Sequence, residues 1–144
     1  MAKRNPPAAP QVLGFTKVDD FKAYFFKNFV WAEVFANRCG TRIRVIFTVQ
    51  NWEHVFCRDS SCFDLERAER MSWILEALQR PEEVRDAYEE NRDVYVLTKD
   101  GWGEDFCVVV KKPNRRGRSH FITAYPPTLK TLLKIRACNP RIWP

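Results

Sequence analysis

The sequence predicts an α+β protein in which helices come first and antiparallel strands follow. Apolar residues recur at helical spacing in residues 21–29 and 65–78. Strand-like runs dominate residues 93–125, where short glycine-containing segments of the kind that join antiparallel neighbours separate them. The order contains no βαβ unit and no glycine-rich phosphate loop, which argues against the nucleotide-binding α/β folds.

Length and composition predict one domain with a basic surface. A chain of 144 residues with 45% hydrophobic content can bury one core, and we expect it in residues 13–144. Residues 1–12 contain three prolines and no apolar period, so we expect a disordered or loosely ordered arm. The formal charge of +6 favours a polyanionic partner, either nucleic acid or an anionic membrane surface.

The cysteines and the N-terminus indicate a cytoplasmic protein. Five cysteines are an odd number in a chain with an ordinary core, which argues against a disulfide framework. The N-terminus lacks the apolar segment of a signal peptide, and the sequence contains no run of eighteen apolar residues. We therefore expect no membrane partner.

Four segments are predicted to be helical. The first begins near Asp19 and runs with an aromatic face to about Asn28. The second begins at Asp64, carries an apolar stripe and ends at Pro81. Acidic residues after Pro81 predict a short helix over residues 81–90, and leucines after residue 128 predict a closing helix.

Four segments are predicted to be strands: residues 42–49, 93–98, 105–112 and 119–125. The third is apolar on both faces and should be central in the sheet. In the last, alternation places Phe121, Thr123 and Tyr125 on the face opposite Ile122 and Ala124.

A few of these residues suit RNA cleavage without a metal ion, which needs an acid, a base and donors around the phosphate. His54 follows the first strand, and an imidazole ordinarily titrates near neutral pH. Arg67 lies at the edge of the apolar arc of its helix, while Thr123 and Tyr125 offer a hydroxyl and a stacking ring. Each has a plainer interpretation: a surface histidine, an arginine whose stem covers the core, and two good strand residues.

A basic cluster could bind RNA phosphates around such a site. It comprises Lys111, Lys112, Arg115, Arg116 and Arg118 around the last predicted turn. Arg70 could share a phosphate or be solvated. His120 has the opposite strand parity to Thr123, so it ranks below His54 as a proton carrier.

Zinc binding is an alternative chemistry. His54, Cys57 and Cys62 are close enough in sequence to share a metal, although their spacing matches no standard zinc knuckle. A fourth ligand would have to come from Cys39 or Cys107. No cysteine has a recognisable activating context for nucleophilic catalysis, so we expect no metal and no cofactor.

An ordered set of features resembles a known nuclease superfamily. It comprises the strand leading to His54, the segment Ile74-Leu75-Glu76-Ala77-Leu78-Gln79-Arg80-Pro81-Glu82-Glu83-Val84, the strand Phe106-Cys107-Val108-Val109-Val110 and the ending Phe121-Ile122-Thr123-Ala124-Tyr125-Pro126. In this order and spacing, residues 44–126 resemble the phage-associated nucleases of the barnase, EndoU, colicin and RelE (BECR) superfamily.

The resemblance implies N-terminal helices packed on a four-stranded antiparallel sheet and a toxin-like endoribonuclease activity. It implies His54 as acid or base, Arg67 as phosphate clamp, Thr123 as hydroxyl donor and Tyr125 as its strand partner. It also implies RNA, with tRNA as a candidate, as substrate, and a cognate inhibitor protein as a possible partner. The flanking residues Trp52 and Glu53 depart from the family pattern, which leaves open a domain that binds RNA without cutting it.

Overall fold

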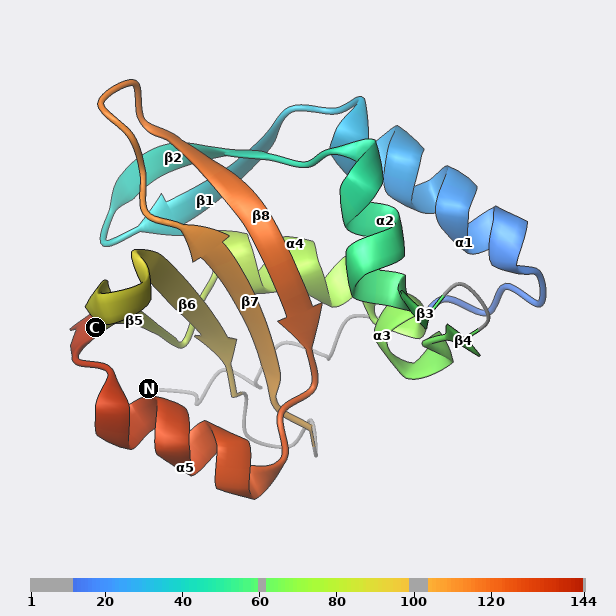
Figure 1. The fold of residues 1–144 in the computed structure, drawn as a ribbon. Helices are drawn as coiled ribbons and strands as arrows, with labels where there is room; N and C mark the ends of the chain where they lie inside the picture. The colour runs from blue at the N-terminus through green and yellow to red at the C-terminus, as the bar shows by residue number, and fades with distance from the viewer. Residues whose placement is uncertain (1–11, 60–61, 99–103, 144) are drawn as a thin grey trace, which may run out of the picture.

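A strongly curled sheet of seven strands organises the computed structural model, which describes residues 12–59, 62–98 and 104–143 (Figure 1). The strand order is β1-β2-β8-β7-β6-β5-β9. Strands β2 and β8 are parallel, and the other neighbouring pairs are antiparallel. The sheet is therefore mixed and forms a half-barrel.

The elements have the following bounds. The strands of the large sheet are β1 (Val34–Arg38), β2 (Thr41–Ile46), β5 (Glu83–Ala87), β6 (Arg92–Leu97), β7 (Phe106–Lys111), β8 (Arg118–Tyr125) and β9 (Arg141–Trp143). A small hairpin joins β3 (Cys57–Asp59) and β4 (Cys62–Phe63). The helices are α1 (Val18–Phe25), with a π-helical turn (Phe26–Val30), α2 (Val49–Phe56), α3 (Leu65–Glu69), α4 (Met71–Gln79) and α5 (Leu129–Cys138).

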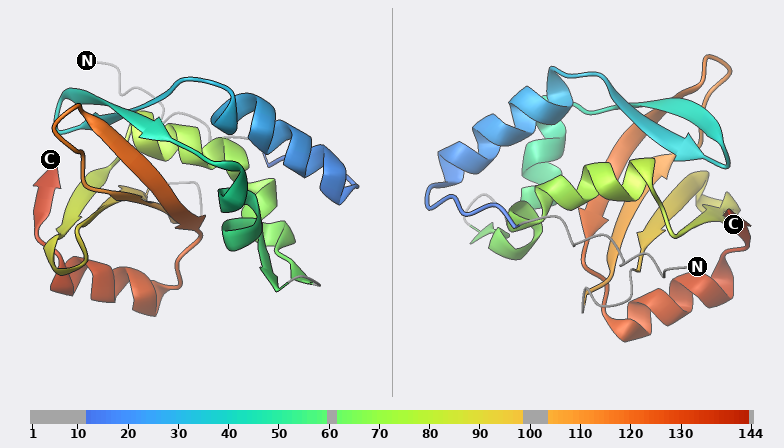
Figure 2. Two further views of the ribbon diagram at one scale, coloured as in Figure 1. Left: turned by 45° about the horizontal axis from the view of Figure 1, so that its top comes forward. Right: turned by 180° about the vertical axis from the view of Figure 1, so that it is seen from behind.

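Helices cover both faces of the sheet (Figure 2). The larger core joins the buried side chains of α1, α2 and α4, such as Phe25, Phe56 and Ile74, to the inward residues of the strands. The smaller core lies on the opposite face, where Leu132 of α5 packs with Val96 and neighbouring strand residues. Among the described residues, no helix is long and apolar enough to cross a bilayer.

The curl of the sheet brings the tip of the β1–β2 hairpin into contact with β6 and β9. At the end of β1, the Arg38 guanidinium donates from Nε to Oδ2 of Asp93 in β6, at 2.6 Å. Asp93 is completely buried, so this ion pair satisfies a charge inside the half-barrel. The neighbouring Cys39 thiol donates to the Ile142 carbonyl of β9 at 3.1 Å. The tip of the β1–β2 hairpin is thus bound to the far edge of the same sheet.

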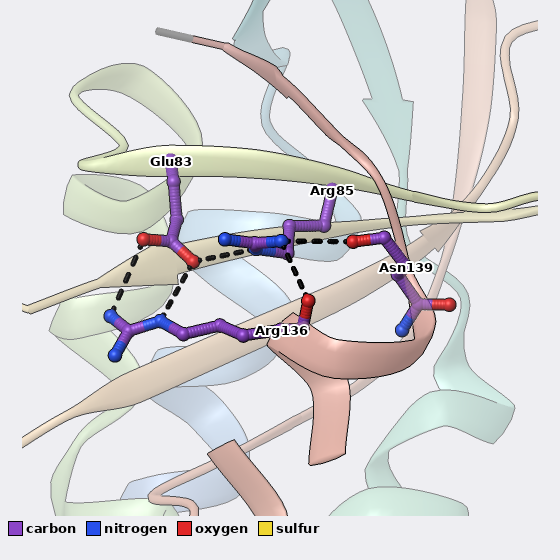
Figure 3. A network of polar contacts seen from close by, with 4 residues as sticks. All are labelled: Glu83, Arg85, Arg136 and Asn139. Carbon is purple, nitrogen blue, oxygen red and sulfur yellow. Dashed lines mark hydrogen bonds and ion pairs between the residues drawn. The ribbon is translucent and has the colours of Figure 1, made fainter. Parts of the chain in front are cut away.

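A polar network attaches helix α5 to strand β5 (Figure 3). Glu83, which is only 4% exposed, accepts hydrogen bonds from Arg85 at 2.8 Å and from Arg136 at 3.0 Å. Arg85 also donates to the carbonyls of Arg136 and Asn139 at the end of the helix. Leu132 is the buried residue of α5, so the helix buries little apolar surface. These polar contacts therefore contribute to holding it on the sheet.

The predicted four-stranded antiparallel sheet is wrong. The four predicted strands exist as β2, β6, β7 and β8, and β7 is central as predicted. Strands β1, β5 and β9 extend this sheet, and β2 pairs with β8 in parallel. Short strands at the ends of a sheet depend on partners that lie far away in sequence, so local alternation does not reveal them.

The predicted helix over residues 81–90 is also wrong. Most of it is β5, whose Val84 is fully buried and pairs with Tyr95 of β6. A short 3₁₀ turn (Tyr88–Glu90) ends the segment. Burial between two strand partners outweighs the local preference that Pro81 and the following glutamates suggest.

Two other predicted element boundaries differ from those in the structure. The strand predicted over 42–49 ends at Ile46, because Thr48 and Asn51 form a capping box that starts α2. His54 therefore lies on a helix and not in a loop. The helix predicted over 64–80 is divided at Arg70, whose φ of −100° and ψ of 20° interrupt it.

The first and last predicted helices are confirmed as α1 with its π-helical turn and α5. Residues 1–11 of the predicted arm lie outside the described residues, as do residues 99–103, which include one of the predicted glycine-containing connections.

Candidate functional site

Three of the four predicted catalytic residues meet at the end of β8. The Nη1 atom of Arg67 donates to the Thr123 hydroxyl oxygen over 3.4 Å, although 56 residues separate the two in sequence. The same guanidinium lies over the Tyr125 ring, 5.5 Å from its centroid. The structure therefore brings together a cation, a hydroxyl and an aromatic ring.

The Arg67 guanidinium is held in a fixed orientation. Asp64 is the N-cap of α3 and accepts from the Arg67 backbone N at 3.1 Å through Oδ1. Its Oδ2 atom lies 3.3 Å from Arg67 Nε, and the Val55 carbonyl lies 3.4 Å from Nη1. Donors fixed in advance are what a site needs to stabilise developing negative charge. This role of Asp64 was not predicted, although its position three residues before Arg67 could have indicated it.

A β-bulge sets which side chains of β8 share a face. Val110 pairs with Phe121 and Val109 pairs with Thr123, which leaves Ile122 as an extra residue. Thr123 and Tyr125 share a face as predicted, but Phe121 does not lie with them. It packs into the larger core, where its ring centroid lies 4.5 Å from that of Phe47.

The same bulge changes the place of His120. Because Ser119 and Phe121 both point into the interior, the exposed His120 lies on the opposite face, which is the face of Thr123. The expectation that its parity differs from that of Thr123 is wrong. One inserted residue between His120 and Thr123 is the reason.

His54 lies on helix α2, which runs beside the second half of β8 (Figure 1). In the described residues, β2 pairs with β8 as far as His120, and α2 then covers the strand edge. Asn51 of α2 donates to the Phe121 carbonyl at 3.3 Å, and His54 follows three residues later on the same side of the helix. His54 is exposed on this flank, next to Val55, whose carbonyl accepts from Arg67.

Two hollows border Tyr125. The smaller, of about 230 Å³, is lined by Asp64, Glu66, Arg67, Tyr125, Pro126, Pro127, Thr128 and Thr131. The larger, of about 430 Å³, lies between α5 and the sheet, and its lining includes Thr123, Tyr125, Arg92 and Lys134. His54 does not belong to either set of described lining residues. The Arg67, Thr123 and Tyr125 cluster thus borders space that a ligand could occupy.

Burial sets the protonation state of Tyr125. It raises the pKa of the phenol above its ordinary value, and the nearby Arg67 charge only partly opposes this rise. The phenol stays protonated at neutral pH, so it can donate a hydrogen bond but is a poor base. Burial likewise raises the pKa of the Cys107 thiol, to about 12.

The predicted RNA-binding residues fall into two groups. Arg115, Arg116, Arg118 and His120 are exposed and line a shallow hollow of about 480 Å³. Lys111 is exposed at the end of β7.

The other two predicted phosphate ligands have carboxylate partners. Arg70 donates twice to Glu104, at 2.7 and 2.9 Å, and Lys112 pairs with Asp86 at 2.5 Å. These ion pairs would compete with a bound phosphate, whereas the exposed group has no carboxylate partner among the described residues.

The structure gives the zinc hypothesis no direct support. Among the described residues, no three His, Cys, Asp or Glu side chains are placed to bind a metal ion together. The Cys62 side chain lies outside the described part, so this hypothesis stays a prediction. Cys107 is buried in β7 with a thiol that remains protonated.

Comparison of the chain with protein-family models, curated proteins and solved structures finds no match. The fold and the site define a class by themselves: a basic α+β protein whose curled mixed sheet presents arginine, threonine and tyrosine side chains at the end of one strand.

Proposed function

We propose that this protein is an endoribonuclease that cleaves RNA without a metal ion. The observation that carries the proposal is the contact between Arg67 Nη1 and Thr123 Oγ1, beside Tyr125 and two surface hollows. A fixed guanidinium and a hydroxyl within one hydrogen-bond distance can bind two oxygens of the same phosphate.

The reaction is an attack of the ribose 2′-hydroxyl on the adjacent phosphorus. A base takes the 2′ proton, the 2′ oxygen forms the new bond, and the bond from phosphorus to the 5′ oxygen breaks. An acid protonates the departing 5′ oxygen, which leaves a 2′,3′-cyclic phosphate and a 5′-hydroxyl. Arg67 and Thr123 stabilise the phosphate charge, and the Tyr125 ring stacks against a base. His54 is the proposed acid or base, and His120 is the second imidazole on the same face as Thr123.

The wider biological setting belongs to the same proposal. The resemblance of residues 44–126 to the BECR nucleases supports RNA as substrate, with tRNA as the first candidate. The net charge of +6 supports a nucleic-acid substrate independently. A toxin-like activity, a cognate inhibitor protein and a cytoplasmic location complete the proposal.

The direct test is incubation of the purified protein with total tRNA in EDTA, followed by mapping of the RNA ends. Cleavage that leaves cyclic phosphate ends, together with a strong loss in His54→Ala, supports the proposal. Intact tRNA would contradict the activity, and equal cleavage by His54→Ala would remove that residue from the mechanism. The variant His120→Ala, in the same assay, tests whether the second imidazole also takes part.

A protein that binds RNA without cutting it is the second candidate. The exposed Arg115, Arg116 and Arg118 favour it, because they suffice for phosphate binding without any reaction. It predicts salt-dependent binding of RNA that stays intact. A zinc-supported interaction domain, the third candidate, predicts stoichiometric metal in the purified protein.

A further inference from the structure

The parallel pairing of β2 and β8 assembles arginines from two distant segments. Arg44 pairs with Arg118 and Ile46 pairs with His120 in the register of the two strands. The inward positions of β2 are the buried Ile43 and Val45, so Arg42 and Arg44 point to the outer side. Arg118 and His120 point to the same side of β8, because Ser119 and Phe121 are buried. We call this surface the basic face: Arg42, Arg44, Arg115, Arg116, Arg118 and His120.

The cations of the basic face are available to a ligand. Within residues 12–59, 62–98 and 104–143, no carboxylate forms an ion pair with its arginines. The Arg42 guanidinium lies over the Phe35 ring of β1, 3.6 Å from its centroid, which holds it on the sheet. The turn before β8 is also fixed, because the Asn114 side chain accepts from the backbone N of Arg116 and of Arg118. Arginines gathered on a defined backbone without counter-charges make a surface suited to a polyanion.

The basic face continues into the candidate site. His120, Thr123 and Tyr125 share one face of β8 because of the bulge at Ile122. Five residues separate Arg118 from Thr123, which is about 17 Å along a strand. A polyanion that lies on the basic face therefore leads along β8 toward the Arg67 and Thr123 pair.

We infer that the basic face is a second RNA-binding surface, which holds the sugar–phosphate backbone next to the phosphodiester that is cleaved. The inference rests on the proposed function for the place of cleavage but not for the binding itself. Arginines that contact phosphates fix the register of a nucleic acid without reading its bases. The substrate class is therefore an RNA long enough to reach both surfaces and recognised mainly through its backbone.

The binding test uses a fluorescent RNA hairpin with 2′-O-methyl riboses, which lack the attacking hydroxyl. Its Kd is measured over a range of salt concentrations for wild type, for Arg44→Gln with Arg118→Gln, and for Lys17→Gln with Lys27→Gln. The control pair removes the same charge from exposed residues near α1. We expect the arginine variant to bind more weakly and to lower the slope of log K against log salt by about 2, while the control keeps the slope of wild type.

Three outcomes would overturn this inference: an unchanged slope in the arginine variant, an equal loss in the lysine control, or binding of phosphatidylserine vesicles but not of RNA. Cleavage distinguishes the two proposals. If the arginine variant binds RNA more weakly but wild type leaves tRNA intact, the inference about the basic face stands and the nuclease proposal is rejected. If wild type cleaves tRNA but the arginine variant keeps the wild-type salt slope, the nuclease proposal stands and the inference about the basic face is rejected.

Discussion

Arg67 Nη1 lies 3.4 Å from the Thr123 hydroxyl and also 3.4 Å from the Val55 carbonyl oxygen. Three elements, α2, α3 and β8, therefore meet at one nitrogen atom. Asp64 fixes the other side of the guanidinium through Nε. This arrangement gives Arg67 a structural role between helices and sheet, and it also presents a fixed cation beside Tyr125. Substitutions of Asp64, Tyr125 and Arg67 separate these two roles.

Asp64 should act as a positioning residue for Arg67. In Asp64→Asn the side chain can still cap α3, because asparagine is a good N-cap, but it loses the charge that faces Arg67 Nε. We expect a melting temperature close to that of wild type and a cleavage rate at least tenfold lower, since an orienting charge is removed. Rate and melting curve are measured on the same preparation. A variant that melts early, or that cleaves at the normal rate, would contradict this role.

Tyr125 should act through its ring. Tyr125→Phe keeps the surface under the Arg67 guanidinium, so RNA affinity should stay close to that of wild type. Tyr125→Ala removes a stacking surface that is typically worth about 1–3 kcal/mol per base, or about 5- to 150-fold in Kd. Affinity for a 2′-O-methyl RNA measures both variants. An equal loss in both would assign the effect to the phenol hydroxyl.

The Arg38 and Asp93 pair should stabilise the closure of the sheet. Arg38→Met leaves the fully buried Asp93 carboxylate without its cation, and we expect a loss of about 3 kcal/mol in the free energy of unfolding. The double variant Arg38→Met with Asp93→Asn should recover part of this loss, because the buried charge is gone. Urea denaturation of the three proteins checks the prediction. A single variant as stable as wild type would show that the pair does not hold the half-barrel.

Glu83 should make the attachment of α5 dependent on pH. Burial raises the pKa of this carboxyl, but hydrogen bonds from Arg136 and Arg85 outweigh burial and hold the pKa below its ordinary value. A lowered pKa means that the stabilisation is complete above the ordinary range of a glutamate and is lost as the pH falls through the folded-state pKa. The free energy of unfolding of wild type should therefore exceed that of Glu83→Gln by about 2 kcal/mol at pH 7 and by much less at pH 3.

Hydrogen exchange of the α5 amides at both pH values is the local measurement for this network. Exchange in wild type should accelerate at pH 3 relative to the intrinsic rate, while Glu83→Gln should exchange rapidly at both. A stability difference that is independent of pH would refute the ionic origin of the attachment.

The sequence predicted best the features that depend on local periodicity. The aromatic face of α1 and the doubly apolar β7 could be assigned because their neighbours in sequence determine burial. The capping box of Thr48 and Asn51 was also readable, and it would have placed His54 on a helix. Strand β5 could not be assigned, because its burial comes from β6 and β9, which lie elsewhere in the chain.

The candidate site was predicted in part for the same reason. The place of Arg67 at the edge of the apolar arc of its helix follows from local sequence, and so does the shared strand face of Thr123 and Tyr125. The structure brings these residues together. The bulge at Ile122 depends on how β8 pairs with β7. Strand alternation alone therefore predicted the wrong face for Phe121 and His120. The pairing of Arg44 with Arg118 joins two parallel strands that lie 74 positions apart in the chain, so no local pattern predicted it.

The most direct measurement is the rate of tRNA cleavage in EDTA by wild type, Arg67→Ala, Thr123→Ala and the double variant. We expect wild type to cleave and each single variant to be about 10²–10³-fold slower, as for removal of one donor to a developing oxyanion. Because both groups act on one phosphate, the double variant should lose much less than the product of the two. Single variants that fold and cleave as fast as wild type would contradict the account.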